Sequence, residues 1–157
     1  MLNIGERVFI ADYGAGCVQD IDSSELRFIK DNYINIYLLL DNMNLMIPID
    51  KIQNYKIRGI LSEVELQTTL FTIASRSDYI ESNWNNRYRI NKKKIQSGNT
   101  LKMCQVIRDL YCLKRENMLP PGEAKILERV EGLVASEIML VFTLDMDSAL
   151  CKIRNLI

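Results

Sequence analysis

The sequence predicts an α+β protein, with a small, strongly bent β-barrel followed by an all-α module of about five helices. Two observations predict this division. From Ile4 to about Arg58, short runs of β-branched and aromatic residues are separated by turn residues. From Ser62 onward, apolar residues recur at helical spacing instead. We therefore expect two domains, at residues 1–58 and 59–157, which is compatible with a chain of 157 residues.

The strands of the first domain are expected where apolar residues lie between turn signals. The four runs are Arg7–Ile10, Gly16–Ile21, Ile34–Leu40 and Leu45–Ile49. The glycines of Asp12-Tyr-Gly-Ala-Gly suit a tight turn between the first two. Pro48 has no N–H for a central ladder, so the last run is predicted to lie at an edge of the sheet or to contain a bulge.

Helix boundaries in the second domain carry local signals. Ser62 and Glu65 predict a capping box for a helix that reaches about Arg76. A second helix is expected from about Asn83 to Gln96, where Ser-Gly ends it, and a third from about Asn99. Pro120-Pro121 opens a fourth, and Asp145 caps a last helix over 146–156. The junction at 55–61 is short and apolar, so we expect a fairly fixed relative orientation of the two domains.

Composition argues against several function classes. The chain has no histidine, which removes Ser/His/Asp and Cys/His nucleophile systems and imidazole metal sites. Its four cysteines form no CxxC pair, so thiolate metal binding is not expected either. We expect a non-enzymatic protein without catalytic residues, metal or cofactor. Free thiols, with neither a signal peptide nor a membrane-spanning run, predict a cytoplasmic location.

The charge of the chain is strongly sorted along the sequence. Lys+Arg and Asp+Glu both number 20, but residues 84–115 carry nine basic side chains against one acidic. Such a cluster suits contact with nucleic-acid phosphates. A solvated helix face is the alternative, although local i, i+4 ion pairs cannot neutralise so lopsided a segment. We favour nucleic acid.

The single tryptophan, Trp84, opens this basic segment in Asn83-Trp-Asn-Asn-Arg-Tyr-Arg. An exposed Trp beside arginines could stack on a base or wedge into a groove of DNA. Trp84, Tyr88 and Ile95 also fall on one helical stripe that could be buried. The pattern leaves core and surface equally open.

Several ordered motifs together resemble the CarD/CdnL family of bacterial RNA polymerase-binding transcription regulators. The resemblance covers nearly the whole chain, and its most specific motif is Asn83-Trp-Asn-Asn-Arg-Tyr-Arg-Ile-Asn-Lys-Lys-Lys-Ile-Gln-Ser-Gly. The motifs that accompany it in order are Gly5-Glu-Arg-Val-Phe, Tyr13-Gly-Ala-Gly-Cys-Val, Leu45-Met-Ile-Pro-Ile, Ile57-Arg-Gly-Ile-Leu-Ser, Val106-Ile-Arg-Asp-Leu and Leu119-Pro-Pro-Gly-Glu-Ala-Lys-Ile-Leu.

The resemblance implies a Tudor-like first domain that binds the polymerase β subunit through an exposed strand. On this chain that strand is Leu45, Met46, Ile47, Pro48 and Ile49. The second domain resembles the family's DNA-binding domain, in which the Trp matching Trp84 enters the minor groove at the upstream edge of the promoter bubble. The predicted DNA-binding residues are Trp84, Arg87, Arg89, Lys92, Lys93 and Lys125, of which Arg87, Arg89 and Lys125 match family positions near the DNA backbone.

The chain also departs from the family pattern. Asn86 stands where the family often has a first Arg after the Trp, and Met46 stands where some members have Arg. The Pro common before the first glycine turn is absent at Ile10-Ala-Asp. These changes bear on the strength of each contact.

The resulting hypothesis is a regulator that binds the polymerase β subunit and promoter DNA, with little base specificity and without a membrane or small-molecule partner, and that stabilises the open promoter complex. The alternative is a polymerase-binding interaction module without direct DNA wedging. An enzyme is the third possibility, and the sequence offers no polar cluster for it.

Overall fold

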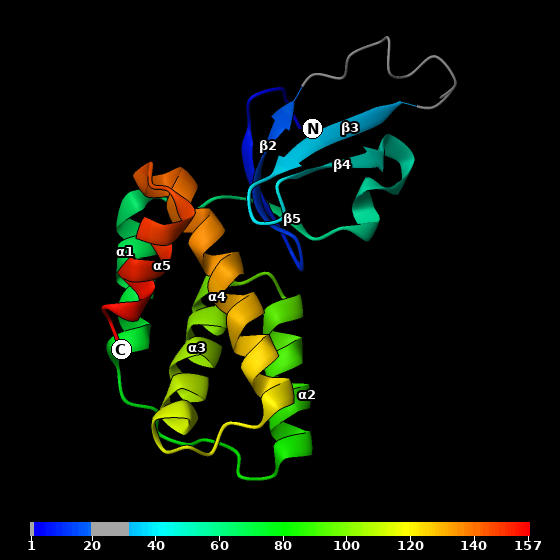
Figure 1. The fold of residues 1–157 in the computed structure, drawn as a ribbon. Helices are drawn as coiled ribbons and strands as arrows, with labels where there is room; N and C mark the ends of the chain where they lie inside the picture. The colour runs from blue at the N-terminus through cyan, green and yellow to red at the C-terminus, as the bar shows by residue number, and fades with distance from the viewer. Residues whose placement is uncertain (1, 20–31) are drawn as a thin grey trace.

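The computed structural model describes residues 2–19 and 32–157, which form a β-sheet packed against a helical module (Figure 1). The α+β class is confirmed. The strands are β1 (Arg7–Ile10), β2 (Gly14–Gln19), β3 (Tyr33–Leu38), β4 (Met43–Pro48) and β5 (Ile57–Gly59). The helices are α1 (Glu63–Leu70), α2 (Trp84–Gln96), α3 (Thr100–Arg115), α4 (Pro121–Phe142) and α5 (Met146–Arg154), with short 3₁₀ helices at Ile49–Asn54 and Phe71–Ala74.

The five strands form one antiparallel sheet in the order β4-β3-β2-β1-β5. A closed barrel is not confirmed, because among the described residues β4 pairs only with β3 and β5 only with β1. The observed second strand, β2, begins at Gly14, two residues earlier than predicted. The last two residues of the predicted strand, Asp20 and Ile21, lie outside the described residues.

The two faces of the sheet pack differently. One face carries a small core of its own, formed by Val8, Ile10, Val18, Ile36, Leu38 and Ile47. On the other face, Phe9 and Ala15 belong to the larger core built mainly by the helices. The larger core therefore takes side chains from both sides of the predicted division at residues 58 and 59, and that division stays a prediction.

The predicted helix starts agree with the observed caps. The Glu65 N–H donates to Ser62 Oγ at 3.2 Å and the Ser62 N–H to Glu65 Oε2 at 2.9 Å, which completes the capping box of α1 and lowers the pKa of Glu65. The side chains of Asn83 and Asp145 cap α2 and α5. The first helix is shorter than expected: α1 ends at Leu70 and gives way to the 3₁₀ turn.

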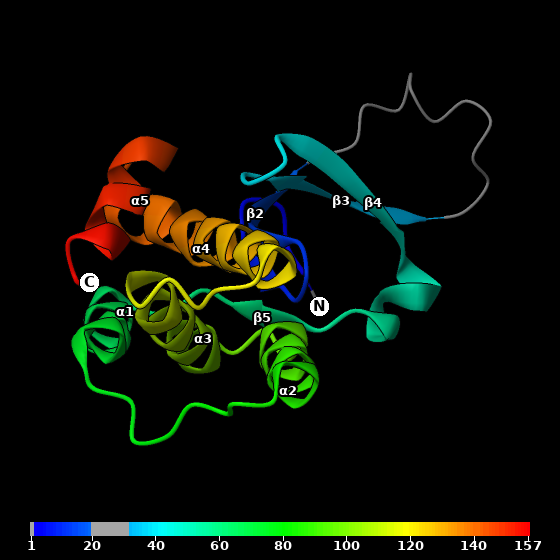
Figure 2. The same cartoon turned by 60° about the horizontal axis from the view of Figure 1, so that its bottom comes forward.

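Helix α4 joins the two parts of the molecule. It packs against β2 on one side and α3 on the other (Figure 2). The Ala15 N–H donates to Ser136 Oγ at 2.9 Å. Gly14 has a φ of +97°, and a Cβ there would lie 2.8 Å from the same oxygen, so this close approach requires glycine. These contacts agree with the expected fixed orientation.

Candidate DNA and polymerase interfaces

Helices α2 and α4 both begin at the end of the helical module that lies away from the sheet (Figure 1). Arg87 of α2 and Glu123 of α4 join these two starts. The guanidinium donates through Nε to Glu123 Oε2 at 2.7 Å and through Nη2 to Oε1 at 2.5 Å. Its Nη1 donates to the Glu81 carbonyl at 2.8 Å. One side chain therefore ties the loop before α2, the first turns of α2 and the first turn of α4.

The ion pair is almost completely buried. Arg87 is 7% exposed and Glu123 is 2% exposed. The hydrogen bonds that Arg87 donates to Glu123 raise the pKa of Arg87. Burial leaves this guanidinium engaged inside the protein, so the geometry favours a positioning role for Arg87, and its predicted contact with the DNA backbone stays a prediction.

Trp84 is the first residue of α2, and its side chain is 59% exposed. The Asn83 side chain accepts hydrogen bonds from the N–H groups of Asn85 and Asn86, which secures the turn that carries the Trp. The buried residues of α2 are Arg87 and Asn91 rather than the stripe of Trp84. The question that the sequence left open is thus settled in favour of the surface.

The other predicted DNA-binding cations are exposed. Arg89, Lys92 and Lys93 lie on α2, and Lys125 lies in the first turns of α4. Arg89 donates to Asn86 Oδ1 at 2.6 Å, and the Lys92 ammonium lies 5.7 Å from the centre of the Tyr88 ring. Their side chains are therefore accessible to solvent, and their contacts with DNA remain predictions.

Sequence reasoning missed Glu123 as a functional residue. An acidic residue in the first turn of a helix is ordinary, because it is favourable beside the positive end of the helix dipole. Its pairing with Arg87 spans 36 positions of sequence, and no local pattern reports it.

The predicted polymerase-binding strand lies at the edge of the sheet, which is one of the two positions that Pro48 predicted. Its residues are exposed to different degrees. Met46 is 38% exposed and Ile49, at the start of the 3₁₀ helix, is exposed as well, whereas Ile47 is fully buried in the sheet's own core. Leu45 and Pro48 are half-buried. Among residues 2–19 and 32–157, no strand pairs with the outer edge of β4, and apolar side chains lie beside that edge.

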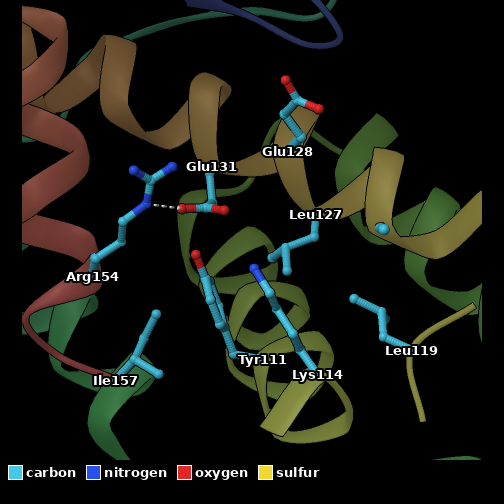
Figure 3. A pocket seen from close by; sticks show the side chains of 9 residues that line it. Tyr111, Lys114, Leu119, Leu127, Glu128, Glu131, Arg154 and Ile157 are labelled. Carbon is cyan, nitrogen blue, oxygen red and sulfur yellow. Dashed lines mark hydrogen bonds and ion pairs between the residues drawn. The ribbon is translucent and has the colours of Figure 1, made fainter. Parts of the chain in front are cut away.

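A cavity of about 670 Å³ lies elsewhere, between α3, α4 and the end of α5 (Figure 3). Its one buried carboxylate, Glu131, accepts a hydrogen bond from Arg154 Nε at 3.1 Å. Burial and the neighbouring Glu131 raise the pKa of Tyr111, which also lines the cavity. The Glu131 carboxylate thus has its counter-charge and hydrogen-bond donor within the protein, as in a structural ion pair.

Two further observations concern the described residues alone. None of their helices is long and apolar enough to cross a membrane. Within the same residues, no cluster of three or more metal-ligating side chains is found.

Comparisons with known proteins cover both halves of the chain. The family model for the CarD-like/TRCF RID domain matches residues 2–61, and the model for the CarD C-terminal domain matches residues 69–154. The chain is 29% identical over 141 residues to the "Putative transcription factor YdeB" of Bacillus subtilis (strain 168). The aligned region covers 90% of this chain and 92% of that protein. Since the C-terminal model alone matches more than half of the chain, the protein belongs to the CarD/CdnL family, whose members are transcription regulators.

Proposed function

We propose that the protein binds the RNA polymerase β subunit through β4 and stabilises the open promoter complex by inserting Trp84 into the minor groove at the upstream edge of the bubble. The observation that carries this proposal is the exposed Trp84 at the start of α2, on a turn secured by Asn83 and clamped to α4 by Arg87 and Glu123.

The wedge favours the open state because apolar side chains enter DNA where base pairs are unstacked. A protein that binds open DNA more tightly than closed DNA shifts the equilibrium by the ratio of the two affinities. The Arg87–Glu123 pair strengthens the binding of Trp84 to DNA, because a side chain on a rigid support loses less conformational freedom when it binds.

The exposed cations contact phosphates on either side of the wedge. Arg89, Lys92, Lys93 and Lys125 supply these contacts, while Arg87 holds the helix that presents them. Phosphate contacts position a protein on DNA without reading bases. The protein therefore prefers melted or easily deformed DNA over any one sequence.

The polymerase contact uses the free edge of β4. Edge strands pair with a strand of a partner through backbone hydrogen bonds, and neighbouring side chains add specificity. Met46 and Ile49 supply apolar contacts there. In this arrangement residues 1–58 bind the polymerase and residues 59–157 bind DNA.

The test is the lifetime of the open complex formed with cognate polymerase, measured with wild type, Trp84→Ala, Phe71→Ala or no added protein. Phe71 is a matched control, because it is an aromatic residue of the helical module whose exposure is similar to that of Trp84. It lies outside α2, directly after the C-terminal end of α1. We expect wild type and Phe71→Ala to lengthen the lifetime and Trp84→Ala to lose the gain. Exposed side chains contribute little to stability, so Trp84→Ala should lose no more than about 1 kcal/mol of unfolding free energy.

A Trp84→Ala protein that is folded, bound to polymerase and as active as wild type would overturn the wedge. The protein would then act as a polymerase-binding interaction module that does not wedge DNA.

A further inference from the structure

The carboxylate of Glu137, near the sheet end of α4, is fully buried at the junction of the sheet and the helices. It accepts hydrogen bonds from Arg58 Nη1 at 2.7 Å and Nη2 at 3.1 Å. It also accepts from Thr100 Oγ1 at 2.6 Å and from the Leu61 N–H at 2.9 Å. An ionised carboxylate can accept about four hydrogen bonds, so Glu137 is saturated by donors from β5, the junction and α3.

Arg58 also contacts two further elements. Its Nε donates to the Gly98 carbonyl in the turn between α2 and α3 at 2.9 Å. Its guanidinium carbon lies 4.4 Å from the centre of the Phe9 ring on β1, where the cation meets the face of the ring. One guanidinium therefore connects two strands of the sheet with the ends of three helices.

Helix α4 carries an ion pair near each of its ends. Glu123, in its first turn, holds α2 and Trp84 through Arg87. Glu137 lies 14 residues later, roughly 21 Å along the helix at the usual rise per residue, and holds the sheet through Arg58. One route from the sheet to the tryptophan thus runs along α4, and a second runs through the Gly98 carbonyl to the end of α2 itself, so a small tilt at the Arg58 contacts displaces Trp84.

The other hydrogen bonds between sheet and helices are single ones, such as those from the Ala15 N–H to Ser136 Oγ at 2.9 Å and from Arg7 Nη1 to the Leu140 carbonyl at 2.7 Å. Phe9 and Ala15 pack against helical side chains, and apolar packing does not by itself fix an angle. Arg129 pairs with Asp41, but both side chains are more than one third exposed, and such pairs contribute little. A buried bidentate Arg–carboxylate pair fixes both distance and orientation.

We propose that Arg58 and Glu137 are positioning residues, which set the direction from the polymerase-binding edge of the sheet to Trp84, so that breaking their contact separates polymerase binding from promoter opening. This inference rests on the proposed function. Polymerase binding needs only β4, whereas insertion of the wedge needs α2 to lie at a defined place relative to β4.

The experiment compares Glu137→Gln with Glu131→Gln. Glu131 is a matched control: it lies on the same helix, is also buried, and is paired with an arginine of α5 rather than of the sheet. Asp41→Asn removes the exposed ion pair between sheet and helices as a second control. Each full-length variant is assayed for polymerase affinity, for open-complex lifetime and, by NMR residual dipolar couplings, for the relative orientation of sheet and helices.

We expect Glu137→Gln to bind polymerase within about twofold of wild type. Its gain in open-complex lifetime should fall at least about fivefold, and its couplings should no longer fit the single alignment tensor that fits wild type. Glu131→Gln and Asp41→Asn should keep both the tensor and the lifetime gain, even where they lower the melting temperature.

A Glu137→Gln protein that keeps the single tensor and the full lifetime gain would overturn the inference. If this variant does not fold, Arg58→Lys replaces it, because it keeps the cation and loses the bidentate geometry, and the same outcomes are decisive. Should wild type itself fail to lengthen the lifetime, the proposed function is wrong, while the couplings still report whether the pair fixes the orientation.

Discussion

At the scale of single residues, Arg87 illustrates how burial changes the role of a charged side chain. Among the predicted DNA-binding residues it is the buried one, and its partner Glu123 is buried with it. Removing two charges from water is costly, and the pair compensates that cost only while both members are present.

Glu123→Gln is therefore expected to destabilise the protein by about 3–5 kcal/mol, because it leaves the Arg87 guanidinium buried without its counter-charge. Glu128→Gln, an exposed change on the same helix, should alter stability by less than about 0.5 kcal/mol. Denaturant unfolding measures both. Equal stabilities for the two variants would show that the Arg87–Glu123 pair does not hold α2 on α4.

At the scale of elements, the edge position of β4 determines what the strand can do. Its alternate side chains face the sheet's core and the solvent. Ile47 is therefore required for packing of that core, whereas Met46 is available for contact with a partner. Pairing with β3 uses one side of its backbone, and the proposed polymerase contact uses the other.

Met46→Asp is expected to weaken polymerase binding by about tenfold or more, because it places a charge in an apolar contact without entering the sheet's core. Ile4→Asp is the control, since Ile4 is even more exposed and lies outside β4. Titration of labelled protein with polymerase measures both affinities. A similar loss in both variants would argue against β4 as the binding edge.

At the scale of the whole molecule, the charge is neutral in total and divided in space. Residues 84–115 carry nine of the 20 basic residues and one of the 20 acidic ones. The exposed cations Arg89, Lys92 and Lys93 lie on the same helix as Trp84, while β4 carries mainly apolar side chains. The molecule thus offers different chemistry to DNA and to polymerase.

Binding to a bubble-containing duplex should therefore weaken as salt rises, because phosphate contacts release counterions. Lys93→Ala should lower the magnitude of the log–log salt slope by about 1 and weaken binding to different sequences alike. Lys51→Ala, an exposed change beside β4, should leave the slope unchanged. Fluorescence anisotropy at several salt concentrations measures the slope, and a change with Lys51→Ala alone would place the DNA contact on the sheet.

The sequence alone determined the α+β class and the helix starts at Ser62, Asn83 and Asp145, and it restricted Pro48 to an edge or a bulge. Caps satisfy N–H groups within three residues, and proline lacks its own N–H, so these signals are local. The family motifs, too, were readable without a structure, and the family models confirm them.

Only the tertiary structure decided that Trp84 is exposed, that Arg87 is buried, that the described sheet stays open and that Glu137 holds Arg58. Each of these outcomes depends on residues far away in sequence: Arg87 meets Glu123 across 36 positions and Arg58 meets Glu137 across 79. A helical stripe shows which side chains share a face, but what covers that face depends on the packing of other elements.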